Sequence, residues 1–337
     1  MPSAPARRVV VITGGTAGVG RATAIAFARE GARVAVLARG AEGLAATCRD
    51  IEAAGGLAMA IPTDVADERQ VEAAAAQVEA RWGVIDVWVN NAMATIFAPF
   101  EQVRADDFRR ATEVCYLGAV WGTQAALRRM KPRNRGVVVQ VGSALAYRSI
   151  PLQAAYCGAK SALRGFTDSL RSELLHEGSA VRLTMVQLPA LNTPQFDWGR
   201  SSMPREPQPM GKVFQPEVAA RAITWASRHP RRELWVGLST VKAIIGTRLI
   251  PGLLDRYLAR TAHGGQLTQT PREPGRPDNL YEPVPGDAGA HGRFGEHAAE
   301  RSWQLAATTT HRSAWWLGLG AAALAGAAWW QGRRPPR

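Results

Sequence analysis

Residues 8–20 read RVVVITGGTAGVG, and this stretch decides the fold. The run from Arg8 to Thr13 is rich in β-branched residues, which is typical of a strand buried on both faces. A glycine-rich loop follows at once, and an apolar helical pattern then runs to Gly31. Glycines let the backbone approach an anion, and the start of a helix offers free N–H groups. The stretch predicts a phosphate-binding loop; the alternative is a tight turn without a ligand.

Strands and helices continue to alternate along the next two hundred residues. The sequence predicts strands at 33–38, 57–61, 84–89, 136–141, 181–186 and 234–236. It predicts helices at 42–54, 67–82, 105–130, 151–178 and 216–228. Strands that alternate with helices of ten residues or more indicate an α/β fold. We therefore expect a Rossmann-type doubly wound parallel sheet flanked by helices.

The stretch from Val137 to Lys160, VVVQVGSALAYRSIPLQAAYCGAK, carries a candidate catalytic set. Tyr156 and Lys160 are four residues apart, so on a helix they share one face. A nearby cation favours phenolate and lowers the pKa of a tyrosine, which suits proton transfer. Ser143 adds a hydroxyl from the end of the preceding strand. The set predicts carbonyl reduction or alcohol oxidation; the alternative is a core tyrosine packed on a lysine stem.

The residues that follow the second strand indicate the cofactor preference. In dinucleotide-binding folds an acidic side chain in this region accepts the adenosine ribose hydroxyls. This chain has Ala38 and Arg39 there instead. An arginine in this region pairs with a 2′-phosphate, so we expect NADP(H) rather than NAD(H). The alternative is a surface arginine without a ligand.

Composition limits the class of protein. The chain has 337 residues and a hydrophobic fraction of 46%, enough for one large domain with a sizeable core. Its cysteines, Cys48, Cys115 and Cys157, do not form a disulfide framework and fit a reducing compartment. We expect no secretory signal and a catalytic domain in the cytoplasm.

The formal net charge of +13 raises the question of nucleic-acid binding. Residues 261–337 hold eight Arg against six Asp and Glu, an excess of 2, so residues 1–260 carry the other +11. These charges are scattered, and no zinc-finger or RNA-binding signature accompanies them. We expect a solvated arginine-rich surface, no nucleic-acid partner and no metal. Attraction for an anionic cofactor or a membrane surface also fits this charge.

Three segments near the carboxyl end differ in composition from the rest. Residues 195–214 are rich in Pro, Ser and Gly and predict a mobile cover on an apolar substrate pocket; an ordinary surface loop is the alternative. Residues 241–258 are apolar but broken by Pro251, which indicates either a lid helix or an interfacial helix. Alternating prolines, glycines and charges over 264–310 indicate a disordered linker.

The run from Ala314 to Trp330, AWWLGLGAAALAGAAWW, is an uncharged stretch of 17 residues. As a helix it would be about 25 Å long, near the short limit for crossing a bilayer. Tryptophan pairs at both ends suit two membrane interfaces. We expect a membrane anchor here; the alternative is a helix that packs on the domain or on a partner. The expected domains are 1–262 for the cofactor-binding domain, 263–312 for the linker and 313–331 for the anchor.

Several motifs occur together in the order and spacing of one family. They are Thr13-Gly14-x-x-x-Gly18-Val19-Gly20, Asn90-Asn91-Ala92, the Ser143, Tyr156 and Lys160 set, and Pro189 with Thr193. Over about residues 7–240 the chain resembles the short-chain dehydrogenase/reductase family, in its compact single-domain branch. The resemblance implies hydride transfer between a nicotinamide and a ketone or secondary alcohol, and a homo-oligomer.

The resemblance also implies roles for individual residues. Tyr156 would be the general acid or base, Lys160 would bind the nicotinamide ribose and lower the tyrosine pKa, and Ser143 would hold the substrate oxygen. Asp64 falls where an acidic residue holds the adenine. With Arg39 from the argument above, the expected cofactor-binding residues are Gly14, Thr16, Gly18, Val19, Gly20, Arg39, Asp64, Val65, Asn90, Ala92, Tyr156, Lys160, Pro189 and Thr193.

The chain departs from the family pattern where an asparagine is usual and Cys115 stands instead. That asparagine helps to seat a water that relays protons to the lysine. Met93 and Ala190 each replace a glycine of the family motifs. These departures leave a rival hypothesis open, namely a catalytically weakened dinucleotide-binding regulatory or scaffold protein. The intact Ser143, Tyr156 and Lys160 set favours the enzyme.

Overall fold

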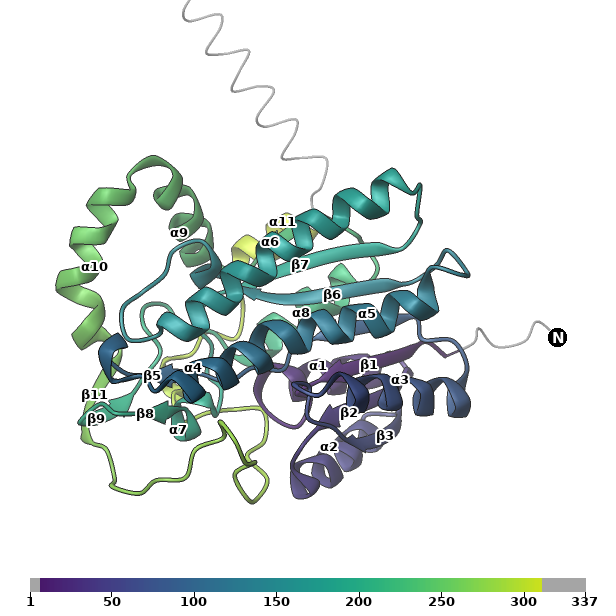
Figure 1. Cartoon of the computed structure of the whole chain (residues 1–337), viewed down its shortest axis with the longest axis horizontal. Helices are drawn as coiled ribbons and strands as arrows, with labels where there is room; N and C mark the ends of the chain where they lie inside the picture. The colour runs from purple at the N-terminus through teal and green to yellow at the C-terminus, as the bar shows by residue number, and fades with distance from the viewer. Residues whose placement is uncertain (1–6, 311–337) are drawn as a thin grey trace, which may run out of the picture.

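The computed structural model describes residues 7–310, which form a seven-stranded sheet with helices on both faces (Figure 1). The strand order is β10-β7-β6-β4-β1-β2-β3, and every neighbouring pair is parallel. The strands are β1 (Val9–Thr13), β2 (Arg33–Ala38), β3 (Leu57–Pro62), β4 (Val87–Asn90), β6 (Val137–Ser143), β7 (Arg182–Leu188) and β10 (Glu233–Trp235). The expected doubly wound parallel sheet is confirmed.

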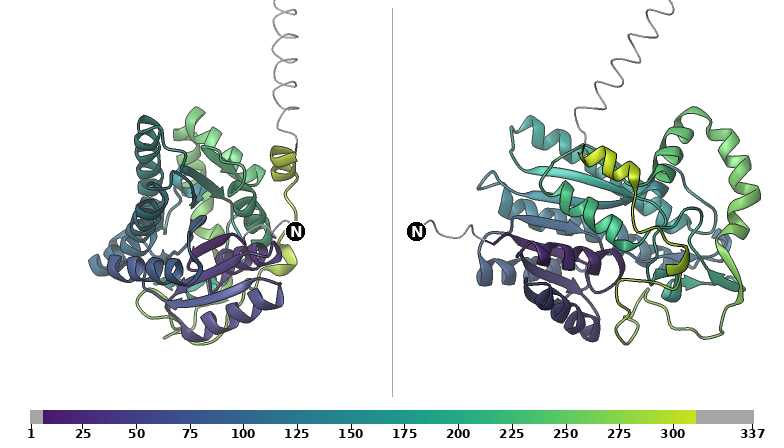
Figure 2. Two further views of the ribbon diagram at one scale, coloured as in Figure 1. Left: turned by 90° about the vertical axis from the view of Figure 1, so that its right-hand side faces the viewer. Right: turned by 180° about the vertical axis from the view of Figure 1, so that it is seen from behind.

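Two layers of helices enclose the sheet, as Figures 1 and 2 show from opposite sides. One layer comprises α3 (Glu68–Trp82), α5 (Gly118–Met130) and α6 (Ala154–His176). The other comprises α1 (Gly18–Arg29), α2 (Ala41–Ala53) and α8 (Pro216–Ala226). Successive strand residues point to opposite faces, so Val9 and Val11 join the first core while Val10 and Ile12 join the second. Burial on both faces explains the uninterrupted apolar strands.

The strand order places a crevice at the carboxyl ends of β1 and β4. From β1 the chain winds outward to β2 and β3, then returns to pair β4 with the other edge of β1. Connections therefore leave β1 and β4 toward opposite sides of the sheet. Open α/β sheets bind ligands at such a switch point, so the glycine loop after β1 lies where a ligand site is expected.

Two helices differ from the sequence prediction in their geometry. The helix predicted over 105–130 consists of α4 (Ala105–Thr112), a π-helical turn over Glu113–Leu117 and α5. A π turn inserts one extra residue and frequently occurs at functional sites. The helix predicted from Pro151 begins at Ala154, because Leu152 adopts φ 67°, a left-handed conformation that no helix continues.

The predicted disordered linker is wrong over its described part, residues 263–310. Strand β11 (Leu267–Pro271) pairs antiparallel with β9 (Arg205–Pro207). Helix α11 (Trp303–Thr310) packs on the domain, and the Gln304 Nε2 donates to the Trp235 carbonyl at 3.1 Å. The many prolines and glycines prevent this segment from forming a core of its own. They do not prevent it from packing on the surface of the domain.

The expected substrate cover contains short regular elements. They are α7 (Gln195–Trp198), β8 (Arg200–Ser201) and β9, and β8 pairs with β5 (Ile96–Phe97). Its Phe196 and Met203 form a small separate core with Phe97, Leu152 and Leu267. The cover is thus packed against both the loop after β4 and the carboxyl-terminal segment.

Helices α9 (Leu238–Leu249) and α10 (Pro251–Gly265) form an arm that projects from the body (Figure 1). They meet at Pro251, where the sequence predicted a break. Leu249 and Leu253 are 74% and 61% exposed at the tip of the arm. This exposure is compatible with both sequence-based interpretations, a lid helix and an interfacial helix.

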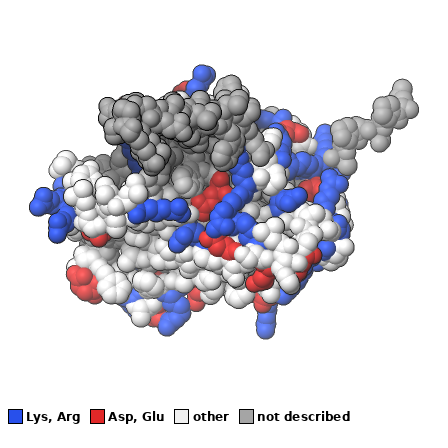
Figure 3. Space-filling view, turned by 90° about the horizontal axis from the view of Figure 1, so that it is seen from above, with Lys and Arg blue, Asp and Glu red and all other residues white. Residues whose placement is uncertain are grey.

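No helix among the described residues is long and apolar enough to cross a bilayer. The predicted anchor, 314–330 within 313–331, lies outside the described residues, so it stays a prediction. On the face shown in Figure 3, basic side chains are interspersed with acidic ones. Among the described residues, Arg128 pairs with both Glu68 and Glu72.

A prediction concerns the packing of α5 on the sheet. A Cβ at Gly122 would meet the Asn90 Oδ1 and would lie 2.7 Å from the Trp88 Nε1, two buried groups that bond to each other. Gly122→Ala should lower the free energy of unfolding by about 2 kcal/mol, since overpacking outweighs the helix propensity of alanine. Urea unfolding measures the change.

Gly165 in α6 is the matched control, because a Cβ there meets nothing within 4 Å. Gly165→Ala should raise the free energy of unfolding by up to about 1 kcal/mol. Equal effects of the two substitutions would contradict the packing described for α5.

Candidate active site

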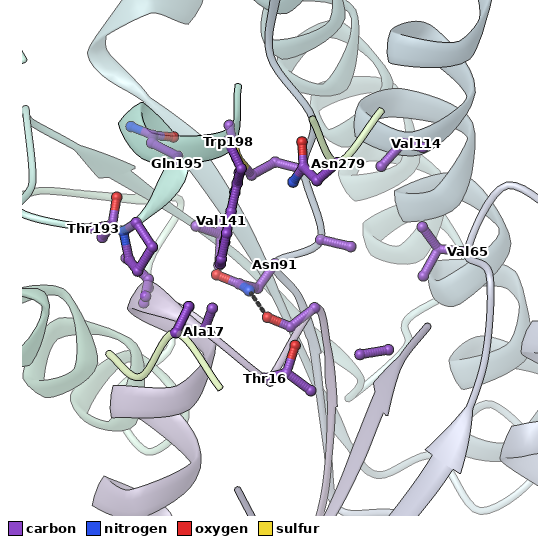
Figure 4. Close-up of a pocket in the computed structure, with 18 of the residues that line it drawn as sticks. Thr16, Ala17, Val65, Asn91, Val114, Val141, Thr193, Gln195, Trp198 and Asn279 are labelled. Carbon is purple, nitrogen blue, oxygen red and sulfur yellow. Dashed lines mark hydrogen bonds between the residues drawn. The ribbon is translucent and has the colours of Figure 1, made fainter. Parts of the chain in front are cut away.

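The glycine loop between β1 and α1 is pressed against the end of β4. Gly14 and Gly18 have φ of 63° and 54°, a region that favours glycine. A Cβ at Gly14 would lie 2.7 Å from the Ala92 Cα. The Asn91 Nδ2 donates to the Gly14 carbonyl at 2.9 Å, the bond drawn in Figure 4. The positive φ angles, the close approach and this hydrogen bond thus hold the loop against the strand end.

A threonine completes the attachment of the loop. The Thr13 hydroxyl accepts hydrogen bonds from the backbone N–H of Asn91 at 3.0 Å and of Ala92 at 3.1 Å. Asn91 belongs to the Asn90-Asn91-Ala92 motif, but it was not among the predicted cofactor-binding residues. Asn90 was predicted instead, but its side chain donates to the Thr123 hydroxyl and the Gln140 carbonyl oxygen in the core.

The cleft at the carboxyl edge of the sheet collects most of the predicted residues. Those that line it are Gly14, Thr16, Gly18, Val19, Arg39, Asp64, Val65, Ala92, Ser143, Tyr156, Lys160, Pro189 and Thr193. Gly20 and Asn90 lie beneath the loop and are absent from this lining. A Cβ at Gly20 would lie 2.5 Å from the Asn91 Nδ2, so Gly20 serves the packing of the loop.

Ser143, Tyr156 and Lys160 meet on one side of this cleft. Ser143 ends β6, and its hydroxyl accepts the Leu145 N–H at 3.1 Å. One helical turn separates Tyr156 from Lys160, and the ammonium lies 5.6 Å from the centre of the phenol ring. The Lys160 Nζ donates to the Val141 carbonyl at 2.7 Å. A hydroxyl, a phenol and an ammonium thus face one space.

The electrostatics of this set differ from the expectation that the lysine lowers the tyrosine pKa. Burial raises the pKa of Tyr156 well above its usual value, and the nearby Ser143 side chain only partly opposes that rise. Burial likewise lowers the pKa of Lys160. A charged form is poorly solvated in this environment, so desolvation dominates both groups in the chain without a ligand. The predicted direction for Tyr156 was wrong for this state.

Cys115 lies in the π turn, against the loop that follows β4. Its thiol donates to the Ala94 carbonyl at 3.0 Å and accepts the Ala94 N–H at 3.1 Å. The side chain is 1% exposed, and burial raises the pKa of the thiol. A protonated, fully bonded thiol is not a nucleophile. Cys115 therefore fastens the π turn to the edge of the cleft.

The opposite end of the cleft holds two charged residues. Arg39 at the tip of β2 donates to the backbone carbonyls of Asn279, Leu280 and Tyr281. Asp64 after β3 pairs with Arg110, while its other oxygen accepts the Ala66 N–H at 3.0 Å. Neither contact was predicted, because both Arg110 and residues 279–281 are distant in sequence.

Sequence reasoning also missed several lining residues. Trp198 and Asn279 reach into the cleft on the side opposite Thr16 and Ala17 (Figure 4). Trp198 had been assigned to the substrate cover without a position in the cleft. Asn279 belongs to a segment interpreted as linker, and its composition gave no signal for a site. Among the described residues no group of three His, Cys, Asp or Glu is arranged to hold a metal ion.

The chain is similar in sequence to one family model and to named proteins of other organisms. Residues 8–201 match the family model for short chain dehydrogenase. An uncharacterised oxidoreductase of Bacillus subtilis is 33% identical over 279 residues, which is 82% of this chain and 78% of that protein. A 3-dehydrosphinganine reductase of Danio rerio is 31% identical over 222 residues, 64% of this chain and 66% of that protein.

Two solved structures resemble the fold closely enough to compare. An alcohol dehydrogenase from the archaeon Thermococcus sibiricus, complexed with 5-hydroxy-NADP, has a TM-score of 0.59 and 26% identity. A metagenomic short-chain oxidoreductase in complex with NADP has a TM-score of 0.58 and 26% identity. Each comparison covers 68% of this chain and 96% of the other.

The buried ammonium yields a prediction about stability. Lys160→Met removes a desolvated charge and keeps the alkyl chain, so the free energy of unfolding should rise by about 1 kcal/mol at pH 7. Burial depresses the lysine pKa in the folded state, so the unfolded state binds more protons and the wild type gains stability as pH rises. The advantage of the variant should therefore shrink toward pH 10. Thermal unfolding across this pH range measures it.

Lys131→Met is the matched control, since Lys131 is exposed and pairs with Glu177 at the surface. Its effect should stay within about 0.5 kcal/mol. A loss of more than about 1 kcal/mol in Lys160→Met would contradict the energetic cost assigned to the buried ammonium.

Proposed function

The chain belongs to the short-chain dehydrogenase family, and on that premise we propose that it is an NADP(H)-preferring oxidoreductase. The proposed reaction is hydride transfer between the nicotinamide and a ketone or secondary alcohol. The single observation that carries the proposal is that Ser143, Tyr156 and Lys160 share one cleft with the glycine loop. General nicotinamide-dependent oxidoreduction follows from the family and its NADP-bound solved relatives.

The residues at the cleft fit a dinucleotide. Gly14 and Gly18 bring the loop close to the ends of β4 and β7, and the first turn of α1 opens toward the cleft. N–H groups at a helix start suit a pyrophosphate. Arg39 and Asp64 would hold the adenosine end, and Lys160 and Thr193 the nicotinamide end. When bound, the cofactor supplies or accepts the hydride.

The remaining chemistry falls to the side chains of the chain itself. Ser143 would donate a hydrogen bond to the substrate oxygen and fix its position. Tyr156 would give its proton to that oxygen as it gains negative charge, or take the proton back in oxidation. Because burial keeps the phenol protonated, it is prepared to act as an acid before any ligand binds. A carbonyl held at the junction of these hydroxyls is therefore the substrate group we propose.

Two relatives support reaction at a carbonyl or an alcohol carbon. One is named a reductase and another an alcohol dehydrogenase. The substrate side of the cleft includes Trp198 and Leu191, which suits an apolar substrate. Homo-oligomerisation, a cytoplasmic domain and a membrane anchor over 314–330 remain further proposals for this chain.

The role of Tyr156 gives a direct prediction. Tyr156→Phe should lower kcat/KM for carbonyl-dependent NADPH oxidation by about 10²- to 10⁴-fold, the usual contribution of a positioned acid. NADPH affinity should change less than about threefold, since a phenyl ring preserves the packing. Activity is measured on a broad carbonyl panel, and affinity by cofactor fluorescence.

Tyr257→Phe on the exposed face of α10 serves as the control and should leave activity unchanged. Undiminished turnover in Tyr156→Phe would refute the assigned acid. NADPH binding without turnover of any carbonyl by the wild type would instead favour the regulatory or scaffold alternative.

The cofactor preference gives a second prediction. Arg39→Ala should weaken NADPH binding by about 10- to 100-fold, because an arginine–phosphate contact contributes about 1.5–3 kcal/mol. NADH binding should change by less than about threefold, since it has no 2′-phosphate. Isothermal titration with both cofactors separates the two effects.

The exposed Arg29 at the end of α1 provides the control, and Arg29→Ala should leave both affinities unchanged. If Arg39→Ala preserved a strong preference for NADPH, the role given to this arginine would be wrong.

A further inference from the structure

A segment near the carboxyl end crosses the outer edge of the cofactor cleft. We call residues 276–289 the strap. Five of its residues, Asn279, Pro283, Val284, Gly286 and Ala288, line the same cleft as the glycine loop and Tyr156. The strap therefore belongs to the wall of the cleft, although it is more than 80 residues from Thr193 in sequence.

One end of the strap is fixed beside α4. Leu280 is fully buried in the core that also holds Val65 and Val114. The Tyr281 hydroxyl donates to the Asp107 carboxylate at 3.0 Å, and the Arg200 guanidinium lies 5.7 Å from the centre of the Tyr281 ring. An apolar anchor and an aromatic anchor thus hold consecutive residues.

The other end of the strap is fixed to α1 and α2. Arg21 is 5% exposed, and its guanidinium pairs with Asp50 at 2.8 Å and with Asp287 of the strap. The Gly289 carbonyl accepts the Gly18 N–H at 3.1 Å, directly at the glycine loop. A buried arginine shared between a helix and the strap is a strong attachment. Charge-assisted hydrogen bonds are stronger than neutral ones, and salt screens a buried pair less than an exposed one.

Between its two ends the strap holds the arginine that we assign to the 2′-phosphate. Arg39 donates to the carbonyls of residues 279–281. A guanidinium has five N–H donors, so these three contacts leave donors for a phosphate. The carbonyls fix the direction of a long side chain that would otherwise lose rotamer freedom on binding. The strap thereby prepares Arg39 for the cofactor.

The strap also contacts the substrate cover. The Asn279 N–H donates to the Trp198 carbonyl at 3.1 Å, and Asp278 pairs with Arg200 at 3.8 Å. Trp198 lies in the cleft beside Asn279 (Figure 4). One segment therefore joins the adenosine end of the cleft to the cover of its substrate end.

We propose that the strap is the outer wall of the cofactor site, that it encloses the adenosine half of bound NADP(H), and that cofactor exchange requires it to lift. This inference rests on the proposed function. It assigns cofactor contacts to residues 279–288, which lie far outside the glycine loop, and makes the residence time of the cofactor a property of the carboxyl-terminal segment.

A reversible covalent lock tests whether the strap must lift. A Cβ built on Gly40 lies 3.3 Å from the Pro283 Cβ. This is close to the roughly 3.5–4.5 Å that separates the two Cβ atoms of a disulfide. Gly40→Cys with Pro283→Cys, made in a Cys48→Ser background, should crosslink under oxidation. Stopped-flow NADPH fluorescence should then show association and dissociation slowed at least tenfold, and dithiothreitol should restore both rates.

The same double variant after reduction is the reference for these rates, and oxidation should change the rates of either single-cysteine variant by less than about threefold relative to its own reduced form. Unchanged rates in the disulfide-bonded protein would overturn the inference. Gel shift after alkylation establishes that the bond has formed, so an unchanged rate refers to a locked strap.

A loosening substitution tests the same inference in the opposite direction. Asp287→Asn weakens the pair with Arg21, which keeps Asp50 and so stays compensated. NADPH should dissociate at least fivefold faster. Asp255→Asn, at an exposed carboxylate of α10 that pairs with Arg148, should leave the dissociation rate unchanged. Slower dissociation in Asp287→Asn would contradict an enclosing wall.

Hydrogen exchange distinguishes an enclosing wall from a competitor for the site. Saturating NADPH should slow amide exchange in residues 276–289 of the full chain by at least tenfold. Faster exchange on binding would mean that the cofactor displaces the strap, and unchanged exchange would mean that the two do not touch; either result overturns the inference. Failure of the wild type to bind NADPH or NADH would instead refute the proposed function itself.

Discussion

The attachment of the glycine loop to the end of β4 is the constraint on which the rest of the site depends. Thr13 and Asn91 reach across from neighbouring parallel strands and hold the loop through backbone groups. A side chain at Gly14 would push the loop away from Ala92. Because the sheet order reverses at this point, the held loop faces an open crevice instead of another strand. The fold thus creates the site at the one edge where its connections diverge.

Around this fixed loop the chain places groups that are costly to bury. Lys160 is 3% exposed, and burial lowers its pKa while raising that of Tyr156. The only polar partner found for the ammonium within the described chain is the Val141 carbonyl. Burial of the two apolar cores on either face of the sheet stabilises the fold. Part of that stabilisation offsets the free-energy cost of burying the lysine and the tyrosine. A bound cofactor with ribose hydroxyls would supply the polar partners that such a lysine lacks.

Local sequence patterns predicted the features that depend on neighbouring residues, such as strand bounds and side-chain spacing on a helix. The bounds of β2 match the predicted 33–38, and Asp67 caps α3 by accepting the Arg69 N–H at 2.9 Å. The four-residue spacing of Tyr156 and Lys160 predicted their common face. Most of the site residues predicted from motifs and family resemblance line the cleft, although the prediction included the core residue Asn90 and omitted Asn91.

What sequence could not supply were contacts between distant segments. The π turn at Cys115 and the left-handed Leu152 depend on packing that no periodicity records. Residues 276–289 were predicted to be part of a linker, because their prolines and glycines do not form a core of their own. In the structure Leu280 packs into the core of the domain, and the Tyr281 hydroxyl donates to Asp107. The direction of the Tyr156 pKa was likewise set by burial in three dimensions.

Transfer of isotope from the cofactor to the product tests the central claim most directly. The chain is given NADPH carrying deuterium at both C4 positions, in ordinary water, with each ketone of a panel. Direct hydride transfer predicts one deuterium per product molecule, at the carbinol carbon, by mass spectrometry and nuclear magnetic resonance. An alcohol product without deuterium at that carbon, or no alcohol from any ketone despite bound NADPH, would contradict the account.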